Sequence, residues 1–320
     1  MPYSFKKCHA ATTIAVFVAL ISTLGVSTAR AEQKTVRLLT IGNSFADNAL
    51  TYLPQIVESD GHQLLVGRAN LGGSTLERHW KHVCQFEADP SNRAGSPYGG
   101  GKLSLKDMLT KETWDFITIQ QVSYKSHDPQ TYQPFADNLH DYIRKHAPGA
   151  TILVHQVWAY RIDDARFNPA NEGREPHTQA AMYQQVRMAY HLLAQELNLG
   201  ILPSGDAMYR ADTDKDWGYR IDNKFDFRNA FYPDLPDQTH SLHAGWTWKK
   251  QEDGTRKLKL DGHHASSAGK FLLGCVWYEK LFQQYVMANS FLPQDMAEEY
   301  AVFLRKTAHQ AVSGNLSQDN

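Results

Sequence analysis

The sequence contains very little cysteine. Three cysteines occur among 320 residues. Cys8 precedes the apolar part of the N-terminal segment, which is the wrong side for a lipoprotein cysteine. Cys84 and Cys275 could form a disulfide if the chain is exported to an oxidising compartment. The alternative is two buried free thiols, since Cys275 lies in the apolar segment LLGCVWYEKLF, where cysteine often acts as a small hydrophobe. The sequence leaves both interpretations open because it does not show whether the two residues approach each other.

An excess of positive charge is also missing. The chain has 33 Lys and Arg residues against 34 Asp and Glu residues, which gives a formal net charge of -1. Residues 1–31 hold Lys6, Lys7, Arg30 and no acid, so their removal would lower this charge by three, to -4. Nucleic-acid-binding chains usually carry a basic surplus or stripe, and neither is apparent here. We therefore expect no nucleic-acid partner.

The sequence has no convincing membrane span. Its N-terminal apolar run, from about Ala11 to Val26, is short for one. The run follows Lys6 and Lys7 and precedes Ala29-Arg30-Ala31, an A-x-A cleavage site, so the pattern is typical of a secretory signal peptide rather than a membrane anchor. We expect residues 1–31 to be a signal peptide. The mature chain, 32–320, would be secreted or periplasmic in a bacterium, with no membrane contact after cleavage.

One stretch near the start of the mature chain organises the rest. Residues 36–50, VRLLTIGNSFADNAL, form an apolar run that ends in Gly42-Asn43-Ser44 and continues with a helical pattern. This predicts a buried first strand with a serine at its carboxyl end. In an open α/β sheet, ligands bind outside the carboxyl ends of the strands. Ser44 is therefore a candidate nucleophile, and the alternative for a serine before a helix is an N-cap.

A serine nucleophile needs a base that is oriented by a third group. Asp261-Gly262-His263-His264 lies near the other end of the chain, just before an apolar segment. Asp261 and His264, three residues apart on a predicted tight turn, could let the carboxylate hold the imidazole in one tautomer while the other ring nitrogen faces Ser44. The alternative role of Asp261 is to cap that turn.

Three blocks carry a resemblance to a known superfamily. Gly42-Asn43-Ser44, the segment NLGGS at 70–74 and the segment DGHH at 261–264 occur in this order. They resemble the serine, glycine and Asp-His blocks of the SGNH (GDSL-like) hydrolase superfamily. The stretches IGNSF, GGSTLERHW, WDFITIQQVS, HQVWAY and DGHHAS are similar to a bacterial branch known mainly as a domain of unknown function. The resemblance covers roughly residues 36 to 285 and implies an α/β/α sandwich that is flavodoxin-like, with a mostly parallel five-stranded sheet.

The resemblance also implies an oxyanion hole. The backbone N–H groups of Ser44 and Gly73 would be two of its donors, although a Gly-Gly pair can also be a plain tight turn. Superfamily members usually carry G-x-N-D after the third strand, and that asparagine donates to the oxyanion; here the predicted strand is followed by Gln120-Gln121. A glutamine amide offers the same donor on a longer arm. We assign this role to Gln121, with Gln120 as the fallback.

Apolar periodicity predicts the remaining elements. Strands are expected at 63–71, 114–119, 151–158 and 200–207, and helices at 46–60, 132–146, 179–197, 266–282 and 294–312. Residues 89–102 form a Gly/Pro/Ser-rich loop without periodicity, which we interpret as an insertion bordering the site.

Three polar or aromatic residues near the predicted third and fourth strand ends are weak candidates for substrate binding. They are Gln120, His155 and Trp158. His155 and Trp158 could shape the acyl or leaving-group pocket. A buried histidine satisfied by hydrogen bonds is the alternative for His155.

Residues 208–260 are rich in aromatic and charged residues and lack a sustained period. We interpret them as a long insertion before the Asp-His turn. Aromatic faces could stack on sugar rings, so the insertion could form a carbohydrate platform. A locally packed satellite core is the alternative.

These features together predict a serine esterase that hydrolyses small acyl esters, acetyl above all, on a small molecule or a glycan. An O-acyltransferase with the same triad is one alternative, and a non-catalytic glycan-binding protein is another. A metal-binding module around His240, His243, His263 and His264 is disfavoured, because their spacing matches no strong zinc signature. We expect neither metal nor cofactor, and the sequence leaves the oligomeric state open.

Overall fold

The computed structural model describes residues 1–4, 33–170 and 176–314. The chain divides into two units, Met1–Glu32 and Gln33–Asn320, and the described helices and strands all lie in the second. The expected signal peptide lies almost entirely outside the described residues. Within the described ranges, no helix is both long enough and apolar enough to cross a membrane.

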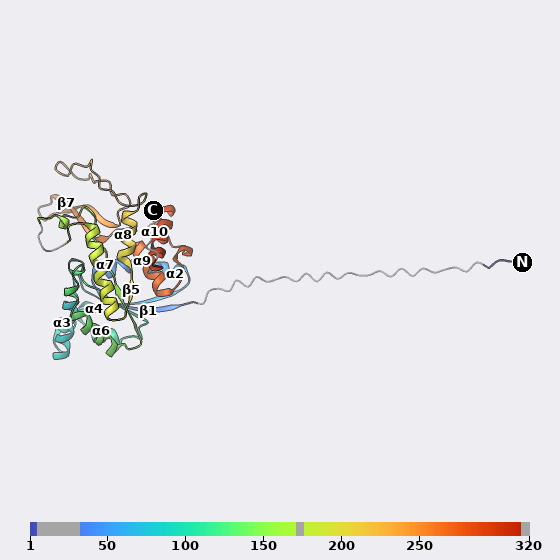
Figure 1. The fold of residues 1–320 in the computed structure, drawn as a ribbon, viewed down its shortest axis with the longest axis horizontal. Coiled ribbons are helices and arrows are strands. Elements are labelled where there is room, and N and C mark those ends of the chain that lie inside the picture. Colours follow the sequence, from blue (N-terminus) through green and yellow to red (C-terminus); the bar gives the residue numbers. More distant parts are fainter. Residues whose placement is uncertain (5–32, 171–175, 315–320) are drawn as a thin grey trace. The chain divides into compact units, whose positions relative to one another are not determined.

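The second unit contains a sheet of five parallel strands (Figure 1). The strands are β1 (Thr35–Gly42), β2 (Gln63–Asn70), β3 (Phe116–Ile119), β4 (Thr151–His155) and β5 (Gly200–Leu202). Their spatial order is β2-β1-β3-β4-β5, and every neighbouring pair is parallel. From Leu38 onwards strand β1 is buried on both faces, as a strand covered by helices on each side must be. The predicted α/β class with a parallel five-stranded sheet is therefore confirmed.

The order of the strands reverses at β1. The chain passes from β1 to β2 on one side and then returns to β3 on the other side. A reversal of this kind opens a crevice at the carboxyl ends of the two inner strands, and open α/β sheets bind their ligands there. Ser44 lies two residues beyond the end of β1. It is therefore at the edge of the sheet where the topology favours a ligand.

Helices pack around the sheet in two groups. Helix α9 contacts α1, α2, α8 and α10, whereas α6 contacts α3 and α5; Figure 1 shows α9 and α10 on one side and α3 and α6 on the other. The helices are α1 (Ser44–Ala49), α2 (Leu53–Ser59), α3 (Leu76–Ala88), α4 (Tyr98–Gly101), α5 (Leu105–Thr110), α6 (Phe135–His146), α7 (Gln179–Glu196), α8 (Ser204–Thr213), α9 (Ser267–Phe282) and α10 (Glu298–Val312). Short 3-10 turns occupy Arg93–Gly95, Ser123–Lys125, Pro129–Thr131, Ala165–Phe167 and Val286–Ala288.

The segment 208–260 is more regular than its sequence suggests. Its first residues continue helix α8, which ends at Thr213, and its last residues form an antiparallel hairpin of β6 (His243–Lys250) and β7 (Arg256–Ala265). Only 214–242 is irregular. The expectation of a patternless insertion is thus wrong at both ends, because short, half-exposed strands with mixed aromatic and lysine residues give no clean alternation.

Several predicted boundaries need correction. The helix expected at 46–60 is two helices, α1 and α2, with Pro54 in the first turn of the second, a position where proline replaces no helical hydrogen bond. The fifth strand ends at Leu202 rather than at Ala207, since Ser204–Thr213 is helical. The fourth strand ends at His155, not at Trp158.

The two cysteines of the second unit are unpaired. Cys84 is exposed on α3 and Cys275 is buried in α9. The disulfide is therefore absent, and only Cys275 fits the alternative of a buried thiol. Burial raises the pKa of the Cys275 thiol well above its usual range.

These two environments predict unequal thiol reactivity. In the chain that begins at residue 32, 5,5′-dithiobis-(2-nitrobenzoate) should react promptly with Cys84 and not with Cys275, because a buried neutral thiol neither ionises nor meets the reagent. The native protein should release about one equivalent of thiolate and the urea-unfolded protein about two. A native protein that releases none until it is reduced would show that the two residues are paired after all.

Candidate active site

Ser44 lies at the start of helix α1 with its hydroxyl free of any capping role. The N-cap of α1 is Asn43, whose side-chain oxygen accepts a hydrogen bond of 3.1 Å from the Phe45 N–H. The capping alternative for Ser44 is therefore wrong. Instead, the Ser44 Oγ lies 2.9 Å from His264 Nε2, across 220 residues of sequence.

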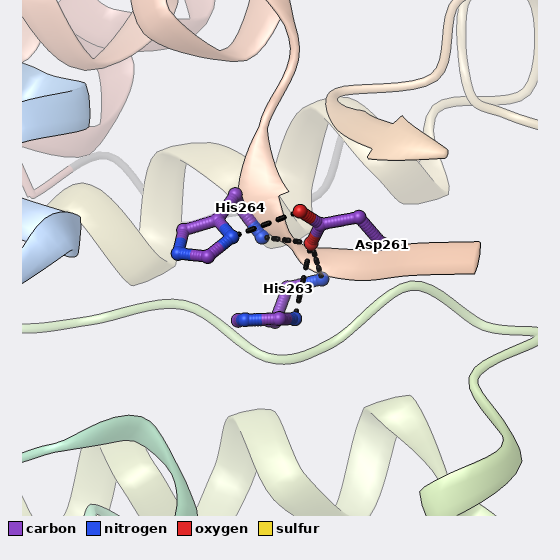
Figure 2. A group of neighbouring side chains, drawn as sticks. All are labelled: Asp261, His263 and His264. Carbon is purple, nitrogen blue, oxygen red and sulfur yellow. Dashed lines mark hydrogen bonds and ion pairs between the residues drawn. The ribbon is translucent and has the colours of Figure 1, made fainter. Parts of the chain in front are cut away.

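Asp261 orients His264 through two contacts (Figure 2). The His264 ring Nδ1–H donates to Asp261 Oδ2 at 2.9 Å, and the His264 backbone N–H donates to Asp261 Oδ1 at 3.0 Å. With its Nδ1 proton directed at the carboxylate, the imidazole presents the Nε2 lone pair to Ser44. The structure thus brings together the three side chains expected to form the triad, in hydrogen-bonding order.

The Asp-His segment is part of a strand, not a separate tight turn as predicted. In the β6–β7 hairpin, Gly245 pairs with Asp261 and His243 pairs with Ala265. One residue of β6 thus faces three residues of β7, 262–264. This irregularity bends the strand so that Asp261 and His264 point at one another.

The carboxylate of Asp261 is held in its ionised form. Half-burial acts to raise its pKa, but hydrogen bonds from His263 and His264 outweigh this and keep the pKa well below its usual range. Asp261 can therefore stabilise the imidazolium that would form if His264 took the proton of Ser44.

His263 is a second histidine on the same carboxylate. Its Nδ1 lies 3.0 Å from Asp261 Oδ1, and its ring lies against that of His264 with centroids 4.0 Å apart (Figure 2). In the described part of the chain, Asp261, His263 and His264 are the one group whose ligand atoms gather closely enough to hold a metal ion. The four-histidine metal module is not formed, because His240 packs against Trp217 and Tyr300 instead.

The glycine loop after β2 offers backbone donors. Gly73 has a left-handed φ of +60°, which glycine adopts without strain. The loop is held on both sides of Gly73: the Asn43 amide donates to Ser74 O at 3.0 Å and Arg78 donates to Gly72 O at 3.2 Å. Among the described residues, no acceptor is recorded for the backbone N–H of Ser44 or of Gly73. Both groups are therefore available to an oxyanion.

Gln121 is not among the residues that the structure brings to Ser44. Its amide Nε2 donates to Thr131 O at 2.9 Å, and its Oε1 accepts from the backbone N–H groups of Leu76 and Val122. The side chain is fully buried. Its donor is used to tie the segment after β3 to the loop before α6, rather than to face the nucleophile.

Gln120 also lies beneath the site rather than in it. Its Nε2 donates to Asn43 Oδ1 at 2.8 Å, and its Oε1 accepts from His155 Nδ1 at 2.9 Å. A Cβ on Gly42 would lie 2.7 Å from that same Oε1, so only glycine permits this approach. The chain of bonds from His155 through Gln120 to Asn43 therefore fixes the N-cap that precedes Ser44.

The weak substrate-binding candidates are all buried and cannot line a substrate pocket. Gln120, His155 and Trp158 are at most 2% exposed. Trp158 supports the site from below: its ring stacks on Phe45 with centroids 4.1 Å apart, and its Nε1–H donates to His263 O at 2.9 Å. The alternative of a buried histidine holds for His155, although its Nε2 has no partner among the described residues.

His79 is a positioning residue that the sequence reasoning missed. It is fully buried, donates from Nε2 to Gly42 O at 3.0 Å and accepts at Nδ1 from the Tyr98 hydroxyl at 2.8 Å. Tyr98 belongs to the loop 89–102, which therefore supports the site from the interior. The only sequence signal was the position of His79 shortly after the glycine block, on the helix that follows it.

Comparison with known proteins gives the family. Residues 37–249 match the family described as Domain of unknown function (DUF4886). The chain belongs to the DUF4886 family. The match ends before Asp261, so the assignment of the Asp-His pair in this DUF4886 protein depends on the geometry above. No curated protein matches the chain.

A solved structure of the same family has the same fold. A DUF4886 family protein from Bacteroides uniformis is 23% identical, has a TM-score of 0.66 and is covered over 96% of its length by 88% of this chain. A putative SGNH hydrolase from Slackia heliotrinireducens is 20% identical, with a TM-score of 0.45 and coverage of 77% of this chain and 98% of that one. The expected resemblance to a branch of unknown function is thereby confirmed.

The buried histidines predict a loss of stability in acid. Burial lowers the pKa of His79 to about 4, whereas in the unfolded chain it is about 6.5. Between these values the unfolded state binds the proton and the folded state does not, so stability present above pH 6.5 falls as the pH drops towards 4. At pH 5 His79 alone should cost about 2 kcal/mol of unfolding free energy relative to pH 7.5.

Urea unfolding of the wild type and of His79→Gln, at pH 7.5 and at pH 5, measures this contribution. The glutamine amide of the variant can still donate to Gly42 O but does not titrate, so the variant should lose about 2 kcal/mol less than the wild type between the two pH values. Equal losses in the two proteins would refute the buried, neutral state of His79.

Proposed function

We propose that this protein is a serine esterase that removes small acyl groups, acetyl in particular, from a carbohydrate. The single observation that carries the proposal is the unbroken series of hydrogen bonds from Ser44 Oγ to His264 Nε2 and from His264 Nδ1 to Asp261 Oδ2. A serine becomes a nucleophile when a histidine accepts its proton and a carboxylate orients that histidine. The three side chains have the contacts that this activation requires. The position at the β1 switch point supports the same role.

The chemistry follows from the positions of the donors and acceptors. His264 Nε2 accepts the Ser44 proton while Ser44 Oγ attacks the ester carbonyl, and Asp261 stabilises the resulting imidazolium. The backbone N–H groups of Ser44 and Gly73 would bind the oxyanion. The alcohol leaves with the proton from His264, and water, deprotonated by His264 in turn, cleaves the acyl-enzyme. Gln121 would join the oxyanion hole only by giving up its bond to Thr131.

The carbohydrate part of the proposal is supported by the aromatic residues on the hairpin that carries Asp261. Trp246 pairs with Leu260, one residue from Asp261. The Trp246 and Trp248 rings pack locally, with centroid contacts to Phe227 and Tyr232, as a satellite core would. Phe231 nevertheless remains 68% exposed, and Tyr232, whose ring also contacts Arg256, 54%. Part of the aromatic surface is thus left for contact with a sugar. The N-terminal signal pattern supports an extracellular or periplasmic substrate.

Removal of a triad residue should abolish ester hydrolysis. Ser44→Ala and His264→Ala should each lower kcat for para-nitrophenyl acetate by about 10⁴- to 10⁶-fold, since neither the nucleophile nor the base has a substitute. The wild type should prefer acetyl over longer acyl esters. Ser313→Ala, which changes an exposed serine at the end of helix α10, is the matched control and should keep full activity.

If the folded wild type hydrolyses no ester faster than Ser44→Ala does, the proposed esterase activity is wrong. An assay that contains both acetylated and free oligosaccharides distinguishes hydrolysis from the acyltransferase alternative. Hydrolysis gives free acetate, whereas transfer gives a newly acetylated sugar. A glycan-binding protein would retain sugar affinity in both variants without any turnover.

The two glutamines should differ in their effects on catalysis. Gln120→Met breaks the link between His155 and Asn43 and should lower kcat about 10- to 100-fold with little change in KM, because Asn43 then no longer fixes Ser44 and the glycine loop. Gln121→Met should mainly lower the unfolding free energy, by about 1–3 kcal/mol, through three unpaired buried groups. A loss of kcat in Gln121→Met larger than in Gln120→Met would instead restore Gln121 as an oxyanion donor.

A further inference from the structure

The β6–β7 hairpin concentrates positive charge that the whole chain lacks. Five cationic residues, Lys249, Lys250, Arg256, Lys257 and Lys259, occur between Trp246 and Leu260, against two acids at its turn, Glu252 and Asp253. The chain as a whole has a net charge of -1. The positive charge of this protein is therefore distributed unevenly, and the hairpin that holds the catalytic carboxylate carries a local surplus.

The register of the hairpin sorts these residues onto two faces. Residues 257, 259 and 261 alternate to the same face of β7, and their partners are Lys249, Thr247 and Gly245. That face therefore carries Lys249, Lys257 and Lys259, which we call the lysine row. The row leads along the strand to Asp261. At about 3.3 Å per residue, Lys259 lies about 7 Å and Lys257 about 13 Å along the strand from Asp261.

The opposite face of the hairpin is already occupied. Trp248 donates to Asp234 O at 2.7 Å and Trp246 donates to Asp163 Oδ2 at 3.3 Å, so the tryptophans face the rest of the molecule. The three residues of the lysine row are all exposed. Lys249 and Lys259 also line a common hollow of about 510 Å³, together with the two acids of the turn. The row therefore faces outward, towards solvent or a ligand.

The lysine row forms no ion pair within the described chain, although Glu252 and Asp253 line the same hollow as Lys249 and Lys259. The recorded ion pairs of lysines are those of Lys106, Lys125 and Lys215. Lys249 and Lys257 stand directly opposite each other across the two strands. Like charges in this arrangement destabilise a sheet, so the row carries a cost that a bound polyanion would relieve.

We propose that the lysine row binds the acidic groups of the leaving-group chain, so that the substrate is an acyl ester of an anionic polysaccharide. The inference rests on the proposed esterase and names its substrate class. A row that ends at Asp261 would hold an anionic chain with an ester beside Ser44. A single-stranded nucleic acid would require aromatic rings between the cations for its bases, and a membrane would require apolar side chains there. Between the lysines this face offers only Thr247 and Gly245.

The test compares two polymers that differ in charge. The probes are O-acetylated polygalacturonate, an anionic polymer, and O-acetylated linear xylan, a neutral one, with acetate release as the measurement. For the wild type, kcat/KM on the polygalacturonate should exceed that on xylan at low salt and fall as NaCl rises, because salt screens exposed charges.

The triple variant Lys249→Gln, Lys257→Gln, Lys259→Gln should lose this preference. The ratio of kcat/KM for the anionic polymer to kcat/KM for the neutral polymer should fall about 10- to 100-fold. The change should arise from a higher KM for the anionic polymer, with kcat unchanged. The dependence of this ratio on NaCl should also be lost. The control is Lys81→Gln, Lys111→Gln, Lys145→Gln, which removes the same charge from exposed positions on α3, after α5 and on α6. It should keep the wild-type ratio.

An equal ratio in the two triple variants would overturn the proposal. If the wild type hydrolyses neither polymer nor para-nitrophenyl acetate, the proposed esterase fails, and direct binding of unacetylated polygalacturonate to the three proteins still tests the row. The lysine-row variant could instead lose binding to anionic phospholipid vesicles or to single-stranded DNA and keep wild-type binding to polygalacturonate. That result would assign the row to one of those partners and overturn the proposal of a polysaccharide substrate.

Discussion

The arrangement of this site depends on holding the backbone of one strand, at residues 262–265, against the carboxyl ends of the parallel sheet. Ser44 and His264 are 220 residues apart in the chain, and the hydrogen bond of 2.9 Å between their side chains persists only if both backbones are held in place. Three contacts supply the rigidity: the Arg161 N–H donates to Gly262 O, the Trp158 ring N–H donates to His263 O, and the Ala265 N–H donates to the Asn48 side chain. The residues after β4 and helix α1 thus grip the strand from two sides. A Cβ at Gly262 would clash with the Asp164 carboxylate, which explains why glycine lies between Asp261 and His264.

A second layer of buried polar groups lies beneath Ser44 and His264 and sets the position of the Ser44 hydroxyl. Gly42 O accepts from His79, and Asn43 is held by Gln120 and in turn holds the carbonyl of Ser74. These bonds join the ends of β1, β3 and the loop after β2, so the hydroxyl and the glycine loop are oriented by one network. A buried network of this kind is costly unless every member is paired. Burial lowers the pKa values of His79 and His155 and keeps both rings neutral. His79 can therefore donate to Gly42 O and accept from Tyr98, and His155 can donate from Nδ1 to Gln120.

The parts of this protein that the sequence predicted are those with a local or repetitive signal. The buried strand before Ser44 is an apolar run, as burial on both faces requires. The long helices have the periodicity that burial of one face imposes, and the Ser, Gly and Asp-His blocks are short motifs. The failures share a cause, because each depends on which distant group a side chain meets. Gln120 and Gln121 follow one strand, but whether their amides reach an oxyanion or Asn43 and Thr131 is decided by tertiary packing. Capping was only the alternative role of Ser44, and the N-cap of α1 is Asn43. Propensities do not decide between these two neighbours, since both residues cap well. The bulge in β7 has no sequence signature, because it depends on pairing with β6.

The net charge of the chain does not show the charge that a ligand meets beside Asp261, and the reason is physical. At physiological ionic strength the field of an exposed charge decays over about 8 Å. A ligand beside Asp261 therefore senses the residues of the hairpin and very little of the remaining surface, whatever the sum over the chain. Lys259, about 7 Å along the strand, lies within that range. A total of -1 is compatible with a positive approach to the site, provided that the cations share one strand face. Only the register of β6 on β7 reveals that Lys249, Lys257 and Lys259 do so.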